Sequence, residues 1–173
     1  MSSFHTYALT PLIRGLKSLT TTLKKAEEHA KANNVPLDEL VNASLIADMK
    51  PLSFQVFMAT NTAVKLLSRA TFVEPPVQSD TDKTFDEFYK RIDETLAALE
   101  KVDPQVFTAD EGKTFKAPLG PREFEFTRES YATRYAVPNF FFHLVTAYDI
   151  LRAKGVPVGK MDYAKDFLGE IAA

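Results

Sequence analysis

One histidine lies in the middle of the most apolar stretch of the chain. This stretch reads YAVPNFFFHLVTAYDILRAKGVPVGK and runs from Tyr135 to Lys160, with His143 near its centre. An unperturbed imidazole titrates at about pH 6.5, so it can transfer a proton or bind a metal ion near physiological pH. Three interpretations stay open: a metal site, a metal-free proton-transfer site, and a core histidine hydrogen-bonded to a neighbour such as Gln55.

A small-molecule pocket at His143 would need polar groups and apolar walls. Asn139 and Tyr135 lie one and two helical turns before it, and the small residues Ala136 and Ala147 leave room beside the ring. The 14 Phe and 6 Tyr of the chain either pack the core or line such a pocket. The catalytic candidates are His143 and Tyr135, and the ligand-binding candidates are Gln55, Asn139, Phe142, Asp48 and Lys160.

A metal site at His143 would need further ligands. First-row ions usually take three or four nitrogen, oxygen or sulfur ligands, and the chain has 3 His and no Cys. The remaining candidate ligands are His5, Gln55, Asn139, Asp48 and Asp162, of which the amides are weak ligands. We therefore expect no tightly bound transition metal and no other cofactor, with a divalent metal as the alternative.

The segment from Gly155 to Tyr163 has two interpretations. It is either a functional loop in which Lys160 contacts an anion, or a helix cap and chain reversal in which Asp162 caps the next helical turn. The isolated His29 is expected on a solvated surface.

The composition limits the class of protein. The 173 residues are 45% hydrophobic and 25% charged, which is typical of a globular protein and predicts one domain over residues 1–173. A net charge of −2 without basic clusters argues against a nucleic-acid partner. No signal peptide or membrane-spanning run is evident, so we expect a cytoplasmic protein without a membrane partner.

Apolar residues recur at helical spacing in four long segments. Pro11 marks where the regular part of the first helix begins, and Pro138 predicts a kink or break in the fourth. Thr84 and Glu87 match a capping box, while Asp38 is a cap candidate for a short helix within 37–47. The predicted long helices cover residues 4–32, 51–70, 85–102 and 128–154, with a loop over 71–83.

A short β-hairpin is predicted before the last long helix. Phe115 and Ala117, and then Phe124 and Phe126, alternate with polar residues on either side of the turn-like sequence PLGP. Thr127 is expected to cap the helix that follows. The predicted fold class is therefore all-α, a four-helix bundle with one hairpin.

Three sequence blocks resemble those of a known family, domain of unknown function DUF1993. They are Asp48-Met49-x-Pro51-Leu52-x-x-Gln55-Val56, Pro138-Asn139-Phe140-Phe141-Phe142-His143, and Gly155-Val156-Pro157-x-Gly159-Lys160-x-Asp162-Tyr163. That family is placed in the DinB/YfiT-like superfamily of proposed metalloenzymes. The resemblance implies a bundle with up-down-down-up connectivity and a homodimer.

The resemblance also bears on the chemistry. Metal-binding members of the superfamily hold a divalent ion with three histidines, one on the second helix and two at HxxxH spacing on the last. At the matching positions this chain has Gln55, His143 and Ala147, so it keeps one of the three ligands. The expected function is binding or conversion of a small organic molecule. An enzyme would be a metal-independent lyase or isomerase, or a DinB-like transferase if a metal site persists. The alternative is a non-catalytic binding or stress-associated module.

Overall fold

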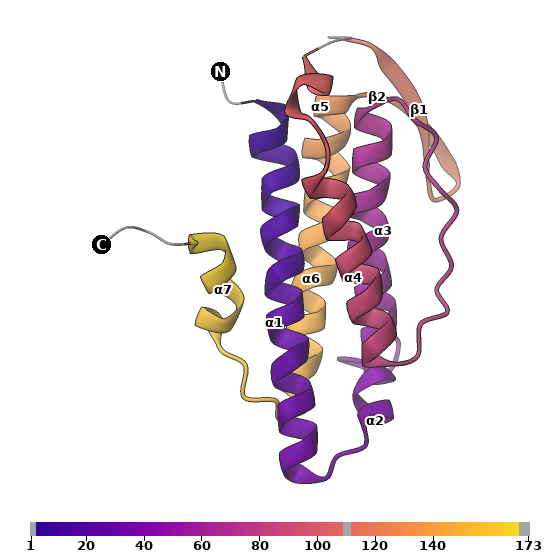
Figure 1. Ribbon diagram of the computed structural model, residues 1–173. Coiled ribbons are helices and arrows are strands. Elements are labelled where there is room, and N and C mark those ends of the chain that lie inside the picture. The colour runs from indigo at the N-terminus through magenta and orange to yellow at the C-terminus, as the bar shows by residue number, and fades with distance from the viewer. Residues whose placement is uncertain (1–2, 109–111, 170–173) are drawn as a thin grey trace.

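Four long helices lie side by side in the computed structural model, which describes residues 3–108 and 112–169 (Figure 1). Helices α1 and α6 run in one direction along the bundle, and α3 and α4 run in the other. The predicted up-down-down-up bundle is thus confirmed. The ends of the expected 1–173 domain lie outside the described residues. The bounds are α1 (Thr10–Asn33), α3 (Leu52–Ala70), α4 (Phe85–Glu100) and α6 (Val137–Ala153).

The connections explain how two consecutive helices can run parallel. After α3 an extended segment, 71–84, returns along the length of the bundle to the start of α4, as predicted (Figure 1). The connection from α1 to α3 contains the short helix α2 (Leu37–Val41). The connection from α4 to the first strand contains a 3₁₀ turn (Pro104–Phe107). Strands β1 (Thr114–Leu119) and β2 (Arg122–Thr127) pair antiparallel and confirm the hairpin. Helix α5 (Arg128–Tyr131) then leads toward α6.

Each long helix turns its apolar stripe toward one shared core. Helix α1 contributes leucines at three- and four-residue intervals, the spacing that places side chains on one helix face. Burying these faces against one another is the main stabilising term for such a bundle. The fully buried side chains include Leu12, Leu16, Leu19, Leu23, Val56, Leu66, Phe88, Ile92, Phe140 and Ile150.

The helix ends follow the predicted caps with one exception. Thr84 and Glu87 form the expected capping box, and Thr127 caps α5 through the Ser130 N–H. Asp38 is not the cap of α2. The cap position is Pro36, two residues earlier, and the helix begins at Leu37, so Asp38 lies inside the first turn, where its charge faces the helix dipole.

Both proline-containing helix starts include a π-helical turn. Residues His5–Leu9 precede Pro11 in this form, which matches the less regular lead-in expected there. Ala132–Ala136 precede Pro138, and the Val137 N–H bonds the Ala132 carbonyl five residues back. Proline lacks an N–H and crowds the preceding turn. The chain therefore meets Pro138 with a wider turn and stays helical through it.

The C-terminal helix α7 (Lys160–Leu168) packs on the outside of α1. Ser18 Oγ donates to the Tyr163 carbonyl at 2.9 Å, and Lys25 Nζ lies 2.8 Å from Asp162 Oδ1. Asp162 also accepts from the Gly159 N–H at 2.8 Å. These contacts support the cap-and-reversal interpretation of 155–163. None of the helices in the described ranges has the length and apolarity needed to cross a bilayer.

A close approach between α1 and α6 depends on a glycine. A Cβ built on Gly15 would lie 2.4 Å from Phe140 Cε1 and 3.1 Å from Leu144 Cδ2. Both of these side chains belong to the buried core, so neither has free space to move into. The ring of Phe140 therefore occupies the volume that any larger residue at position 15 would need.

The first prediction follows from this contact. Replacing a mid-helix glycine by alanine ordinarily stabilises a helix by about 1 kcal/mol. Here Gly15→Ala overpacks the core and is expected to lower the free energy of unfolding by about 1–3 kcal/mol. Urea denaturation measures this, with Lys24→Ala on the exposed side of α1 as the control. Unchanged or increased stability of Gly15→Ala would contradict the close packing.

Candidate functional site

Three polar pairs cross the interface between α3 and the α5–α6 helix, and we call them the polar ladder. Their α3 members are spaced seven residues apart, so they lie on one helix face. The residue numbers of the partners decrease as those on α3 increase, because the two helices are antiparallel (Figure 1). The pairs are Gln55 Oε1 with His143 Nδ1 at 2.8 Å, Thr62 Oγ1 with Asn139 Nδ2 at 2.8 Å, and Arg69 Nη1 with Tyr131 OH at 2.6 Å.

The first pair assigns the proton of His143. Gln55 Nε2 donates to the Lys50 carbonyl at 2.9 Å, so the amide oxygen is the atom that faces the ring. That oxygen can only accept, and Nδ1 must therefore carry the proton. Nε2 of the neutral ring is left as an acceptor. It has no hydrogen-bond partner among the described residues and is not sealed from solvent.

Burial sets the charge of this imidazole. The side chain of His143 is 7% exposed, and Gln55 is 2% exposed. Removal from water disfavours the charged ring and lowers the pKa of His143 to about 4. The rings of Phe54 and Phe142 meet it edge-on, with centroids at 6.0 and 5.2 Å. At physiological pH the imidazole is thus neutral and has two aromatic rings beside it.

The structure brings some of the candidate residues together. Gln55 contacts His143 directly, and the Phe142 side chain, 59% exposed, lies beside the ring. Asn139 lies one turn away on the same helix, and its amide is engaged by Thr62. The hydrogen bond between His143 and Gln55 was one of the three interpretations of the sequence, and the structure has it.

Other candidates lie apart from His143. Tyr135 precedes it by eight residues, about 12 Å along a helix axis, and its ring packs on Tyr131. Asp48 is exposed in the turn before α3, with no described contact to the site. Lys160 lines a separate cavity of about 250 Å³ with Asp149 and Tyr163.

Two participants were missing from the sequence analysis. Phe54 forms one aromatic wall, and Thr62 holds Asn139. The seven-residue repeat of polar residues at Gln55, Thr62 and Arg69 was the available signal, because it marks a polar line along a helix that is otherwise apolar on that side.

These residues do not fit the three-histidine metal arrangement implied by the superfamily. Ala147, one turn after His143, offers no donor atom, and Gln55 Oε1 already accepts from the imidazole. Over residues 3–108 and 112–169, no group of three His, Cys, Asp or Glu side chains is placed to hold a metal ion. A divalent ion at His143 would have one imidazole nitrogen and no second strong ligand.

Comparison with known proteins supports the fold and the resemblance. The sequence model of the domain of unknown function DUF1993 matches residues 4–164. The chain is similar to the crystal structure of a DinB family member protein from Shewanella denitrificans, with 33% identity and a TM-score of 0.85. The match covers 98% of this chain and 94% of the other. No curated protein matches this chain.

The buried imidazole predicts a pH-dependent stability. Its pKa is about 4 in the folded protein and about 6.5 unfolded, so only the unfolded chain binds the proton between these values. The stabilisation is complete above pH 6.5 and is lost as the pH falls toward 4. Between pH 7 and pH 4, wild type should lose about 3 kcal/mol more unfolding free energy than His143→Gln.

Urea titrations at both pH values measure this difference. The control is His29→Gln, which replaces a histidine of α1 that is not fully buried and should lose stability in parallel with wild type. Parallel losses for wild type and His143→Gln would mean that the ring titrates normally in the folded protein.

Proposed function

We propose, from the premise that the chain belongs to the DUF1993 family and has a DinB-like fold, that it binds a small organic molecule at His143 without a metal. The observation that carries this proposal is the solvent-accessible Nε2 of a neutral imidazole whose other nitrogen is fixed by Gln55. Because the ring is held in one orientation, the lone pair of Nε2 points in a fixed direction and can accept one hydrogen bond. The bound molecule would supply the N–H or O–H donor.

The surroundings of Nε2 define the class of ligand. Phe54 and Phe142 present aromatic surface beside the acceptor, and Phe142 is largely exposed. Flat apolar groups pack well against such rings, and a hydroxyl or N–H fixes their orientation. A phenol or a similar aromatic donor therefore suits the site better than a charged or purely aliphatic molecule.

Binding is favoured over proton-transfer catalysis. A base whose conjugate acid has a pKa of about 4 accepts a proton weakly at neutral pH, whereas efficient general bases titrate near the working pH. Tyr135, the second catalytic candidate, lies about 12 Å along the helix from His143. The transferase alternative would need the metal ligands that Gln55 and Ala147 replace. A binding module thus suits these residues better than a lyase, isomerase or transferase.

A matched pair of fragments tests the proposal. Phenol can donate to Nε2, and anisole has the same ring without the donor. In ¹H–¹⁵N NMR titrations, phenol is expected to shift amide resonances near residues 54–58 and 139–146 and to bind about tenfold more tightly than anisole, the factor of one good hydrogen bond. His143→Phe should abolish the preference, and His29→Gln should keep it. Equal affinities in wild type, or shifts confined to other regions, would refute the proposal.

We also propose a homodimer through the outer face of α6. Phe142 and Val145 are 59% and 41% exposed there, and apolar side chains grouped on a helix face often mark an interface. Light scattering at micromolar concentration is expected to give twice the chain mass, and Val145→Glu should return the monomer mass. A monomer for wild type under these conditions would contradict the assembly.

A further inference from the structure

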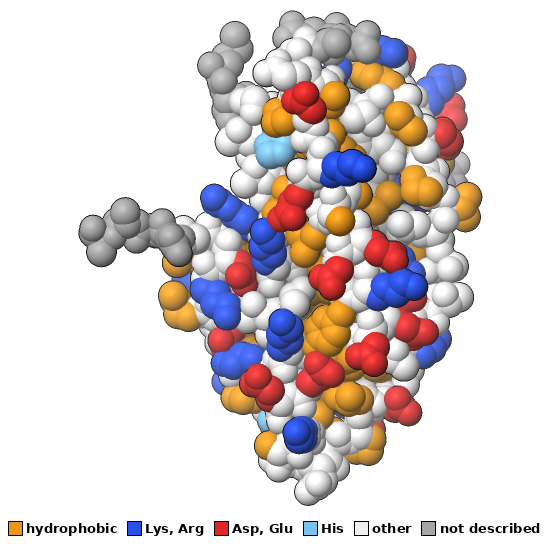
Figure 2. Space-filling view, viewed as in Figure 1, with side chains coloured by type: hydrophobic (Ala, Val, Ile, Leu, Met, Phe, Trp, Pro, Cys, Tyr) orange, Lys and Arg blue, Asp and Glu red, His pale blue; other side chains and the backbone are white. Residues whose placement is uncertain are grey.

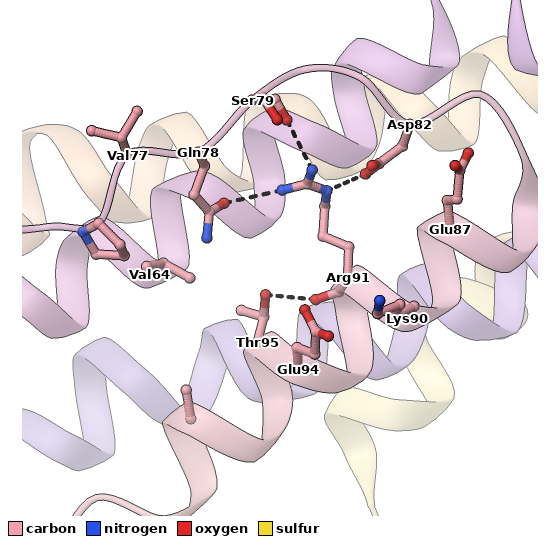
Figure 3. A pocket seen from close by; sticks show the side chains of 12 residues that line it. Val64, Val77, Gln78, Ser79, Asp82, Glu87, Lys90, Arg91, Glu94 and Thr95 are labelled. Atoms are coloured by element: carbon pink, nitrogen blue, oxygen red, sulfur yellow. Dashed lines mark hydrogen bonds and ion pairs between the residues drawn. The ribbon is translucent and has the colours of Figure 1, made fainter.

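The extended segment between α3 and α4 is held in place by Arg91. Its Nε pairs with Asp82, Nη1 donates to Gln78 Oε1 at 3.1 Å, and Nη2 donates to the Ser79 carbonyl at 2.9 Å (Figure 3). The guanidinium also lies over the Phe57 ring at 5.3 Å. All three nitrogens of Arg91 are thus used to fix residues 78–82 against α4. In the close-up these side chains converge on the guanidinium from the segment above it.

Two cavities lie along the extended segment. The one on the α4 side, of about 560 Å³, has a lining of mixed charge, with Asp82, Glu87 and Glu94 beside Lys90 and Arg91. The cavity between the last turns of α3, residues 72–78 and β1 measures about 580 Å³. Pro76, Val77 and Gln78 line both. We call the second one the cationic cavity, because its charged lining residues are Lys65, Arg69, Lys113, Lys116 and one acid, Glu74.

Helix α3 lines the cationic cavity with three donors at successive turns. Asn61, Lys65 and Arg69 follow each other at intervals of four residues and so share one face. The Asn61 side chain is 7% exposed, and its amide has no hydrogen-bond partner among the described residues. Arg69 gives one nitrogen, Nη1, to Tyr131. These donors are therefore placed to meet an acceptor within the cavity.

Lys65 is the group that most needs such an acceptor. It is half-buried, and no ion pair or hydrogen bond to it exists in the described part of the chain. Burial, and then the charge of Arg69, lowers the pKa of its ammonium group. Lys65 and Arg69 are like charges on one face of α3 and repel each other, and a bound anion would relieve both the repulsion and the desolvation.

The apolar side of the cavity is built around Phe72, which follows the last turn of α3. Its φ of 56° is the left-handed conformation of a helix C-terminal cap, in which the Val73 N–H bonds the Ser68 carbonyl at 2.8 Å. The Phe72 ring meets Phe115 edge-on at 6.2 Å and lies 4.2 Å from Lys113 Nζ. The left-handed turn redirects the chain at the end of α3. It leaves the Phe72 ring as an aromatic surface of the cavity, beside the cationic side chains.

We infer that the cationic cavity is a binding site for a small organic anion. Its carboxylate or phosphate would be held by Asn61, Lys65 and Arg69, while its apolar part packs on Phe72 and Phe115. Charge-assisted hydrogen bonds to Lys and Arg are stronger than neutral ones, and the planar guanidinium of Arg can bind two oxygens of either a carboxylate or a phosphate. The site is distinct from His143, because its donors come from the second half of α3 and its remaining walls from residues 72–78 and β1, whereas Gln55 lies in the first turn of α3.

Three probes with a common ring test this site by ¹H–¹⁵N NMR titration. Benzoate and phenyl phosphate carry the two candidate anions, and benzamide is the neutral analogue of benzoate. At least one of the two anions is expected to shift resonances in 61–78 and 113–118 and to bind about tenfold more tightly than benzamide. The tighter of the two anions identifies the preferred head group.

Variants of Lys65 decide the role of the charge. Lys65→Met keeps the unbranched side chain and should weaken binding of the preferred anion about tenfold, while Lys65→Arg should restore it. The matched control is Lys90→Met, on the far side of the segment, which should bind as wild type does. The inference is overturned if neither anion binds at millimolar concentration, if benzamide binds equally, if Lys65→Met has wild-type affinity, or if the shifts centre on residues 55 and 143.

Discussion

The hydrogen bond between Gln55 and His143 fixes the register of the two helices that carry the candidate site. Breaking a buried polar pair is costly, because each partner then has no hydrogen bond, either to the other residue or to water. Sliding α6 by one turn, about 5.4 Å, would separate this pair and also those of Thr62 with Asn139 and Arg69 with Tyr131. The polar ladder therefore favours the one alignment of the two helices in which all three pairs form.

The same bond decides what the imidazole can do. Because Gln55 accepts at Nδ1, the ring presents Nε2 outward as an acceptor, and burial keeps it neutral. A neutral ring with a low pKa is a poor base but a well-placed recognition group. A divalent ion would need several strong ligands at this interface, whereas Gln55 and Ala147 offer His143 only an amide and a methyl group. The DinB-like fold of this chain thus has an amide and an imidazole paired at the interface of α3 and α6. On the face drawn in Figure 2, acidic and basic side chains are interspersed.

Local patterns in the sequence predicted most of the fold. The apolar stripes, the Thr84 capping box and the hairpin around PLGP all act within a few residues, so spacing alone reveals them. One of the three interpretations of His143 named Gln55 as its hydrogen-bond partner, because Gln55 is a polar residue near an apolar stripe. Asp38 was wrong as a cap because residue preferences locate a helix end only to within one or two residues, and the cap is Pro36. The cationic cavity escaped prediction, since α3, the 72–78 segment and β1 meet only in the folded chain.

The most direct test of this account is the protonation state of His143 itself. Long-range ¹H–¹⁵N NMR of the imidazole distinguishes a protonated ring nitrogen from one with a free lone pair and follows both through a pH titration. At pH 7 we expect a proton on Nδ1, a free lone pair on Nε2, and a titration midpoint at about 4. A proton on Nε2, or a midpoint near the unperturbed value of about 6.5, would contradict the account.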